Sequence, residues 1–529
     1  MRIPSINGYT CGIHLKLRIF FALVLSLSLI PRIGWSEDNG KPYYTDRGQF
    51  NYASFLMDEH DFPAAAREFS RLIEDFPGSP YASPAQLSLG KAYLFAGRYV
   101  EARDEFRRFL ANYPEAPQAP SAKQVLNEAV EMIKARPVPS EPPPQAPSAG
   151  GPGERGPRIH AVQVMFFKGG TLAEVEAEVK RLKGAGVDTL ILRVFHNSAD
   201  RYYRFARHTE KRGVYFKTTH APVVDDILGD MIRIAHAHGL RVFAWMTTRY
   251  ADYGVEDRED LACKGYDMGS GKEMMCKGLD LFNEEAVKRL EAIYSDLADY
   301  DIDGVLFQDD LILRHNEGFG PHARRLFRAE TGSVLYPASL YVMGEGGTGA
   351  HYTKLFWEWA SWKNRRLLDV AGRLREAVRK KRPSTKFAIN LMYESVVKPP
   401  YSLAWLSQDI GAAKRYGFDY YSIMAYHRQM EEELGRPMEE IRGMIRKMMK
   451  DAVETVGDGG RVLIKLQTVD WKTGGSLPDG EVLGLAREVG ADGGVSLAVV
   501  PYREDFPFGE IWPKPVSSLG GVVPGRFKR

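Results

Sequence analysis

Two adjacent carboxylates, Asp309 and Asp310, follow the apolar segment 304–308. If that segment is a strand, successive side chains point to opposite faces, so the two aspartates cannot both face the same way. One can act as a catalytic acid while the other supports it or caps the next helix. Glu394 lies at the end of the next apolar segment, 386–393. Paired carboxylates are the groups that cleave glycosidic bonds. The two aspartates could instead only cap a helix or bind solvent, and Glu394 could be structural.

Aromatic and polar residues follow the other apolar segments. Pyranose rings stack on aromatic faces, so carboxylates interleaved with Trp and Tyr indicate a sugar site. Each aromatic residue could equally belong to the core, and the histidines could be hydrogen-bonded rim residues. The candidate substrate-binding residues are His196, Asn197, Trp245, Arg249, Tyr393, Tyr426, His427, Gln467, Asp470, Trp471 and Tyr502.

Eight apolar segments rich in branched and aromatic residues alternate with amphipathic helical patterns. This alternation favours parallel strands with right-handed crossovers, and eight strands close an α/β fold of the (β/α)8 TIM-barrel type. In such barrels the chemistry lies at the C-terminal strand ends. An open doubly wound sheet is less well supported, because no Gly-x-Gly-x-x-Gly follows the first segment. The segments are 161–167, 189–195, 241–247, 304–308, 386–393, 420–426, 461–467 and 494–502.

The N-terminal part has the pattern of helical repeats. The motif from Asp61 to Phe69 recurs 37 positions later, from Arg98 to Phe106, and each copy is followed by an aromatic residue and Pro. This pattern resembles tetratricopeptide repeats over residues 45–135, which would bind a protein partner or merely space the barrel. Eight prolines between 136 and 158 predict an extended linker. The barrel is therefore expected at 159–515.

Lys16 and Arg18 precede an apolar run at 19–30, and Gly34 and Ser36 are small residues where a signal peptidase reads. This pattern predicts a signal peptide at 1–36 and a protein exported to the periplasm or the outer membrane. The run is too short to span a membrane, which takes roughly 20 residues. Residues 1–36 carry four basic residues and no acid, so their removal changes the formal charge from +3 to −1. That charge gives no case for nucleic-acid binding.

Two cysteines, Cys263 and Cys276, close a short loop beyond the predicted signal peptide. In an oxidising compartment a disulfide is expected, because zinc would need further ligands that are not nearby. We expect no metal and no cofactor.

The segment from Asp303 to Asp310 resembles the C-terminal glycoside hydrolase domain of the poly-β-1,6-N-acetylglucosamine N-deacetylase family of biofilm proteins. The resemblance covers about 159–510 and implies cleavage of partially deacetylated poly-β-1,6-N-acetylglucosamine, with Asp309 and Asp310 at the centre. A carboxylate-lined groove would also attract the ammonium groups of that polymer. Further matching segments are 161–164, 281–284, 294–297, 390–393, 423–426, 465–471 and 501–506.

Two departures from this family stand out. Helical repeats replace its N-terminal deacetylase domain, so we expect no deacetylation and no catalytic metal. His427 and Arg428 follow Tyr426 where the family is expected to carry an acid, which could alter or abolish cleavage. The sequence thus predicts an exported glycoside hydrolase acting on this polysaccharide during biofilm matrix processing or export. The alternative is a non-catalytic polysaccharide-binding scaffold that docks a secretion partner through its repeats.

Overall fold

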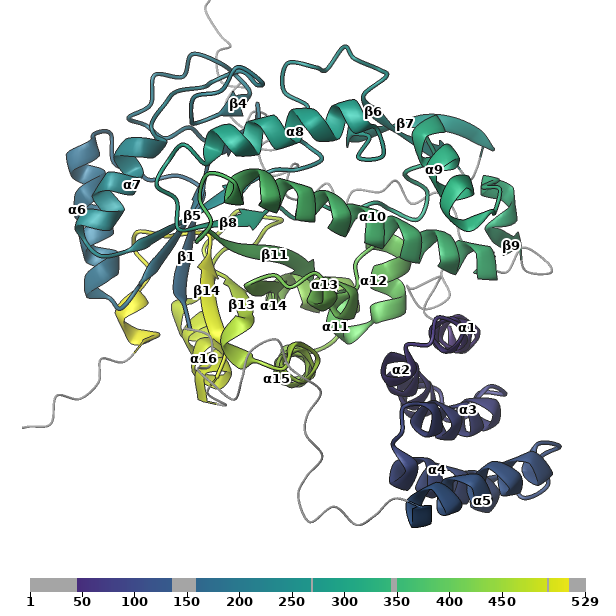
Figure 1. Cartoon of the computed structure of the whole chain (residues 1–529). Coiled ribbons are helices and arrows are strands. Elements are labelled where there is room, and N and C mark those ends of the chain that lie inside the picture. The colour runs from purple at the N-terminus through teal and green to yellow at the C-terminus, as the bar shows by residue number, and fades with distance from the viewer. Residues whose placement is uncertain (1–44, 136–157, 268–269, 344–349, 492–493, 513–529) are drawn as a thin grey trace, which may run out of the picture.

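The computed structural model describes residues 45–135, 158–267, 270–343, 350–491 and 494–512 (Figure 1). The predicted signal peptide and the predicted linker up to residue 157 lie outside these ranges. Within them, no helix combines the length and the apolar character needed to cross a membrane.

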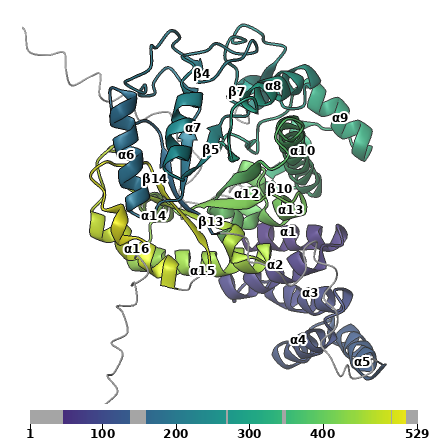
Figure 2. The same ribbon diagram turned by 60° about the vertical axis from the view of Figure 1, so that its left-hand side comes forward.

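Eight parallel strands close into a barrel, as the sequence predicts (Figures 1 and 2). The first strand pairs with both the second and the last, in the registers Ala161 to Thr189 and Ala161 to Ala498. Branched and aromatic residues fill the strands because both faces of a parallel sheet are covered. The barrel strands are β1 (His160–Val164), β2 (Thr189–Arg193), β5 (Arg241–Met246), β8 (Gly304–Phe307), β11 (Lys386–Met392), β12 (Tyr420–Met424), β13 (Val462–Gln467) and β14 (Ser496–Val500).

Amphipathic helices surround the barrel. In the first of them Thr171 and Glu174 form a capping box, and the stripe of Val175, Val179 and Leu182 is buried against the strands. The outer helices are α6 (Leu172–Gly184), α7 (Leu228–Ala237), α8 (Glu284–Leu297), α10 (Lys354–Arg379), α13 (Ile410–Arg415), α15 (Met438–Val456) and α16 (Asp479–Ala491).

Additional elements follow the C-terminal ends of the barrel strands. They include a hairpin of β6 (Ala262–Asp267) and β7 (Lys272–Leu279) between β5 and α8, which no apolar pattern predicted. The others are β3 (Phe195–His196), β4 (Gly213–Val214), α9 (Pro321–Thr331), β9 (Tyr341–Met343), β10 (Ala350–Tyr352), α11 (Glu394–Val397), α12 (Pro399–Leu406) and α14 (His427–Leu434).

The two cysteines lie on this hairpin, Cys263 on β6 and Cys276 on β7. Both are free thiols, so the predicted disulfide is not formed in this structure. They lie close together, since the neighbouring Cys263 raises the pKa of the Cys276 thiol. A register shift between Ala262 and Lys264 removes Cys263 from the regular cross-strand pairing. Proximity of the two residues was therefore predicted correctly, but the bond was not.

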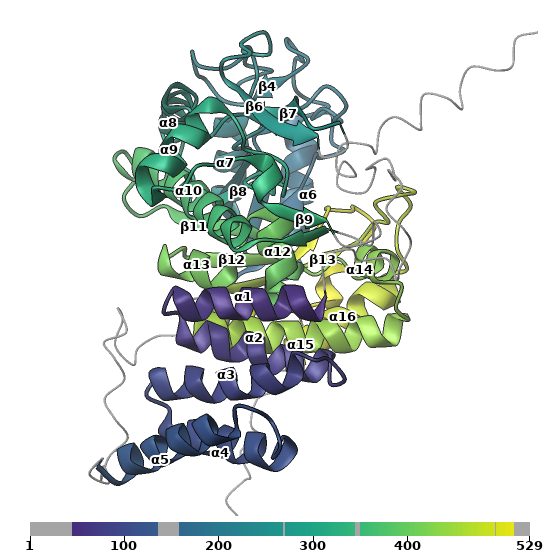
Figure 3. The ribbon, with the colours of Figure 1, turned by 90° about the vertical axis from the view of Figure 1, so that its right-hand side faces the viewer.

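Five consecutive helices form the N-terminal repeats (Figure 3). The 37-residue period recurs in their side-chain hydrogen bonds. The buried Gln49 amide donates to Glu68 at 2.9 Å, and Gln86 donates to Glu105, one period later, at 2.7 Å. The same hydrogen bond thus recurs within each of two successive helical hairpins, between their first and second helices. The helices are α1 (Asp46–Asp58), α2 (Phe62–Asp75), α3 (Ala82–Phe95), α4 (Tyr99–Asn112) and α5 (Ala119–Ala135).

The first helical hairpin packs directly against the barrel (Figure 3). The ring of Tyr52 on α1 lies 5.3 Å from that of Trp357 on α10, and its hydroxyl donates to Asp409 at 3.2 Å. On α2, Arg71 donates to the carbonyl oxygen of Val396 at 3.2 Å. Part of the repeat surface is therefore occupied by the chain's own barrel and cannot serve another partner.

Replacing Tyr52 by Ala should lower the free energy of unfolding by about 3 kcal/mol, because the change empties a buried aromatic site at this interface. Chemical denaturation of the whole protein measures the loss. Tyr52→Phe, which keeps the ring and removes only the hydrogen bond to Asp409, should cost about 1 kcal/mol. Equal stability of Tyr52→Ala and the wild type would show that the interface contributes nothing.

Candidate active site

A pit opens at the C-terminal mouth of the barrel, where residues from most of the strands converge. It contains polar side chains of both charges together with aromatic rings, which is the composition of a site for a polar ligand with apolar faces. Its polar lining residues are Gln163, Arg193, Asn197, Asp200, Lys277, Gln308, Asp309, Asp310, Arg314, Asn390 and Lys465, and its aromatic ones are Phe195, Trp245, Tyr250, Tyr426 and Trp471.

Asp310 is the structural member of the aspartate pair. It is 1% exposed, and its carboxylate accepts hydrogen bonds from the hydroxyls of Thr247 and Thr248, at 2.5 and 2.7 Å. The backbone N–H groups of Thr248 and Tyr250 also donate to it, both within 3.0 Å. Asp310 thereby fixes the loop that follows β5 and has little capacity left for a ligand.

Asp309 is the member of the pair whose carboxyl stays available to a ligand. Burial raises the pKa of its carboxyl above the ordinary value; Lys465 opposes the shift and Asp310 adds to it. In the described parts of the chain, no side chain donates a hydrogen bond to Asp309. A carboxyl group that is desolvated, accepts no side-chain hydrogen bond and opens to a pit is suited to proton transfer.

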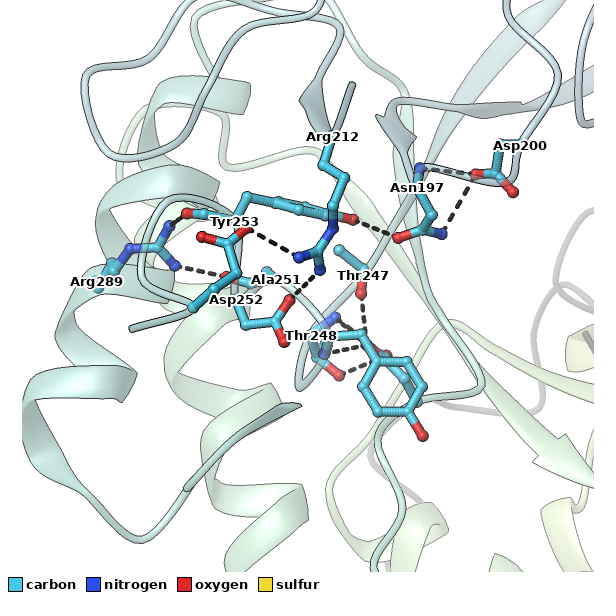
Figure 4. Close-up of polar contacts among 12 residues, drawn as sticks. Asn197, Asp200, Arg212, Thr247, Thr248, Ala251, Asp252, Tyr253 and Arg289 are labelled. Carbon is cyan, nitrogen blue, oxygen red and sulfur yellow. Dashed lines mark hydrogen bonds and ion pairs between the residues drawn. The ribbon is translucent and has the colours of Figure 1, made fainter. Parts of the chain in front are cut away.

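A second carboxylate, Asp200, stands in the wall of the pit. It forms an ion pair with Arg193 at 3.0 Å and accepts a hydrogen bond from the backbone N–H of Asn197 at 2.9 Å. The Asn197 amide oxygen in turn accepts from the Tyr253 hydroxyl at 3.3 Å (Figure 4). The pit therefore combines one desolvated carboxyl group with one that is ion-paired to a guanidinium.

Five buried polar atoms of pit residues have no hydrogen-bond partner in the described ranges. They are the amide oxygens of Gln163 and Gln308, the indole nitrogens of Trp245 and Trp471, and Nε of Arg193. Buried polar groups are normally paired, since leaving one unpaired costs about 1–3 kcal/mol. Two acceptors and three donors beside aromatic rings are the complement of the hydroxyl groups and apolar face of a sugar.

Six of the residues predicted from the sequence line this pit: Asn197, Trp245, Asp309, Asp310, Tyr426 and Trp471. Tyr426 is packed near the reactive acid, because burial and the negative charge of Asp309 raise the pKa of its phenol. The structure brings these six together from β2, β5, β8, β12 and β13.

Glu394 does not line the pit and cannot be the carboxylate that faces Asp309 there. It begins α11, where burial and the neighbouring Glu433 raise the pKa of its carboxyl well above the ordinary range. The adjacent Tyr393 donates its hydroxyl to Glu433 at 2.9 Å and is buried. Tyr393 and Glu394 lie outside the pit lining because the chain enters helix α11 directly after β11 ends.

His427 and Arg428 also leave the pit. Both bind Glu481 on α16, at 2.7 Å for His427 Nε2 and 2.5 Å for the closest guanidinium contact. The Gln467 amide oxygen accepts a hydrogen bond from the backbone N–H of Arg428 at 3.0 Å. His427, Arg428 and Gln467 therefore anchor α14 to the barrel. The residues at 427–428, where the family is expected to carry an acid, do not place a cation in the pit.

The remaining predicted ligands have structural partners. The buried His196 contacts the Tyr215 hydroxyl at 2.9 Å, and Arg249 pairs with Glu317 at 2.7 Å. Asp470 accepts from two backbone N–H groups of its own turn, both at 2.8 Å. Tyr502 stacks on Phe508 and accepts from an arginine of α6.

The sequence prediction missed several residues that line the pit. Asn390 and Lys465 stand in the middle of apolar strands and hydrogen-bond to each other at 3.2 Å, and Gln163 has the same position in β1. A polar residue inside an apolar barrel strand is a signal that could have found them. Tyr250 and Lys277 lie on a loop and a hairpin outside the barrel strands and carried no such signal.

In the ranges that the structure describes, no three His, Cys, Asp or Glu side chains lie close enough together to hold a metal ion.

A closed parallel barrel with two carboxyl groups and unpaired sugar-type contacts at its mouth is the architecture of a barrel glycoside hydrolase. Residues 173–498 match the family described as hypothetical glycosyl hydrolase family 13, and the chain belongs to that family. Residues 45–126 match a family described as an outer membrane lipoprotein.

Among solved structures, the glycoside hydrolase domain of PgaB (BpsB) from Bordetella bronchiseptica shares the barrel fold. It is 20% identical, with a TM-score of 0.52, over 66% of this chain and 95% of that one. The catalytic domain of a β-amylase from Paenibacillus polymyxa is 10% identical over 65% and 93% of the two chains, with a TM-score of 0.44. No curated protein matches the chain.

Proposed function

We propose that the protein is an exported glycoside hydrolase that cleaves partially deacetylated poly-β-1,6-N-acetylglucosamine during the processing or export of a biofilm matrix. The observation that carries the proposal is the Asp309 carboxyl, desolvated at the end of β8 among unpaired sugar-type donors and acceptors. The resemblance of the segment from Asp303 to Asp310 supports the polymer. The barrel shared with the glycoside hydrolase domain of PgaB supports the fold of a hydrolase. The outer membrane lipoprotein match at 45–126 supports a location beyond the inner membrane.

In the proposed mechanism Asp309 is the general acid, because its raised pKa keeps the proton available at higher pH. It donates this proton to the glycosidic oxygen as the bond to the anomeric carbon breaks. Asp200, which is ion-paired with Arg193, either takes a proton from the attacking water or attacks the anomeric carbon itself. Inversion or retention of the product anomer, observed by NMR, distinguishes these two roles of Asp200.

Lys465 should determine the pH range over which Asp309 is active as a general acid. Its positive charge lowers the pKa of Asp309, so Lys465→Met should raise that pKa further. The limb of the kcat/KM profile that reports Asp309 should then move to higher pH, while Lys465→Arg, which keeps the charge, should leave it near its wild-type position. A limb that does not move in Lys465→Met would show that Lys465 has no electrostatic influence on the acid.

A non-catalytic, polysaccharide-binding export scaffold is the second candidate. It is favoured by the helical repeats and by the absence of Glu394 from the pit. Binding and cleavage measured in parallel separate the two functions. A hydrolase should shorten the β-1,6-linked polymer and leave a β-1,4-linked glucosamine polymer intact. A scaffold should bind the β-1,6-linked polymer without changing its length.

A further inference from the structure

The Asp200 carboxylate is held through one of its two oxygens. Arg193 Nη1 lies 3.0 Å from Oδ2, and the backbone N–H and the side-chain amide of Asn197 donate to the same oxygen, at 2.9 and 3.3 Å. Among the described residues, none donates a hydrogen bond to Oδ1. Oδ1 is therefore the oxygen that remains for a water molecule or a reacting carbon in the pit.

The Asn197 side chain is committed to this carboxylate at one end and to Tyr253 at the other. Its amide nitrogen points at Asp200, and its amide oxygen accepts from the Tyr253 hydroxyl at 3.3 Å (Figure 4). An amide turned by half a rotation would set its oxygen against the carboxylate, so the donor at the far end fixes the direction in which the amide faces. Burial raises the pKa of the Tyr253 phenol well above its ordinary value, so the hydroxyl keeps the proton that it donates.

Tyr253 is fixed by the fold and does not line the pit. Its ring is fully buried, and the Arg212 guanidinium lies 5.3 Å from the ring centroid. Arg212 also pairs with Asp252 at 2.5 Å, and Arg289 on α8 donates to the carbonyl oxygens of Ala251 and Tyr253 (Figure 4). Two arginines from different elements therefore hold the turn that carries Tyr253.

We propose that Tyr253 is a positioning residue for Asp200, acting from outside the pit through the Asn197 amide. This inference rests on the proposed function, in which Asp200 takes a proton from the attacking water or attacks the anomeric carbon. Either role requires Oδ1 to keep one direction, because misplacing a reacting group by about 1 Å costs roughly a hundredfold in rate. The buried hydroxyl and the amide hold Oδ2 in place and leave Oδ1 open to the pit.

Tyr253→Phe removes the hydroxyl and keeps the buried ring. In the whole protein, kcat on partially deacetylated poly-β-1,6-N-acetylglucosamine should fall about tenfold, while KM stays close to the wild-type value. In an Asp200→Asn background the same change should cost no further activity, because the group that it orients is already lost. A residue that only stabilised the fold would lower activity equally in both backgrounds. Tyr421→Phe, which removes the hydroxyl of another fully buried tyrosine outside the pit, should keep the wild-type kcat.

Binding separates this inference from the proposed function. The probe is a protonated piperidine iminosugar with the configuration of glucosamine, whose cationic nitrogen imitates the charge that develops at the anomeric centre. Calorimetric titration should show about tenfold weaker binding to Tyr253→Phe than to the wild type, and no such difference in the Asp200→Asn background. If no variant cleaves the polymer but this coupling is present, the hydrolase proposal fails and the positioning role holds. An iminosugar affinity that Tyr253→Phe leaves unchanged, or lowers equally in both backgrounds, would overturn the inference.

Discussion

Asp309→Asn should reduce kcat on the β-1,6-linked polymer by about a thousandfold, with little change in the stability of the protein. An amide cannot donate the proton that the leaving oxygen needs, and a positioned general acid contributes roughly 10²- to 10⁴-fold. The substitution is nearly isosteric, and the side chain makes no hydrogen bond to another side chain in the described ranges, so the fold should not depend on its charge. Oligosaccharide release per unit time measures the effect.

Asp301→Asn provides the matched control. Asp301 lies just before the same strand, at the opposite end of the barrel, and its side chain is 68% exposed. This variant should be as active as the wild type. Unchanged activity of Asp309→Asn would remove Asp309 from the chemistry, whatever the other variants do.

Asp310→Ala should have the largest effect on stability, lowering the free energy of unfolding by about 3 to 5 kcal/mol. The change removes the acceptor of the buried hydroxyls of Thr247 and Thr248 and of the N–H groups of the loop after β5. Each unsatisfied group costs about 1–3 kcal/mol. Part of that cost is regained as the loop relaxes into water. Urea denaturation followed by circular dichroism gives the value.

Asp310→Asn separates the loss of the carboxylate from the loss of volume. It retains one acceptor oxygen but points an amide N–H₂ group at other donors, so its stability should fall between those of the wild type and Asp310→Ala. Both variants should also lose activity, because Tyr250 on the same loop lines the pit. Stability of Asp310→Ala within about 0.5 kcal/mol of the wild type would contradict the structural role.

The barrel could be predicted from sequence because all eight strands are short apolar segments separated by helical patterns and Gly-rich returns. The hairpin of β6 and β7 could not, since its outer strand from Lys272 to Leu279 is polar and largely exposed. Its pairing is stabilised by backbone hydrogen bonds that leave no hydrophobic period. Lys277, the residue of the hairpin that bears on the site, was missed for the same reason.

The candidate site was predictable in part. The rule that chemistry gathers at the C-terminal strand ends selected Asp309, Trp245 and Trp471, which line the pit. It could not tell which strand-end side chains point into the pit, so it also selected Glu394 and His427, which lie outside the pit lining because the chain turns directly into helices there. Orientation at a strand end depends on where the next helix begins, and that is fixed by tertiary packing.

Release of new reducing ends from partially deacetylated poly-β-1,6-N-acetylglucosamine, followed for the wild type and Asp309→Asn side by side, tests the central claim most directly. The account predicts short oligosaccharides from the wild type and almost none from Asp309→Asn, while both proteins bind the polymer equally well. Binding by both proteins without release of oligosaccharides from either would contradict a hydrolase and assign the protein to the class of polysaccharide-binding scaffolds.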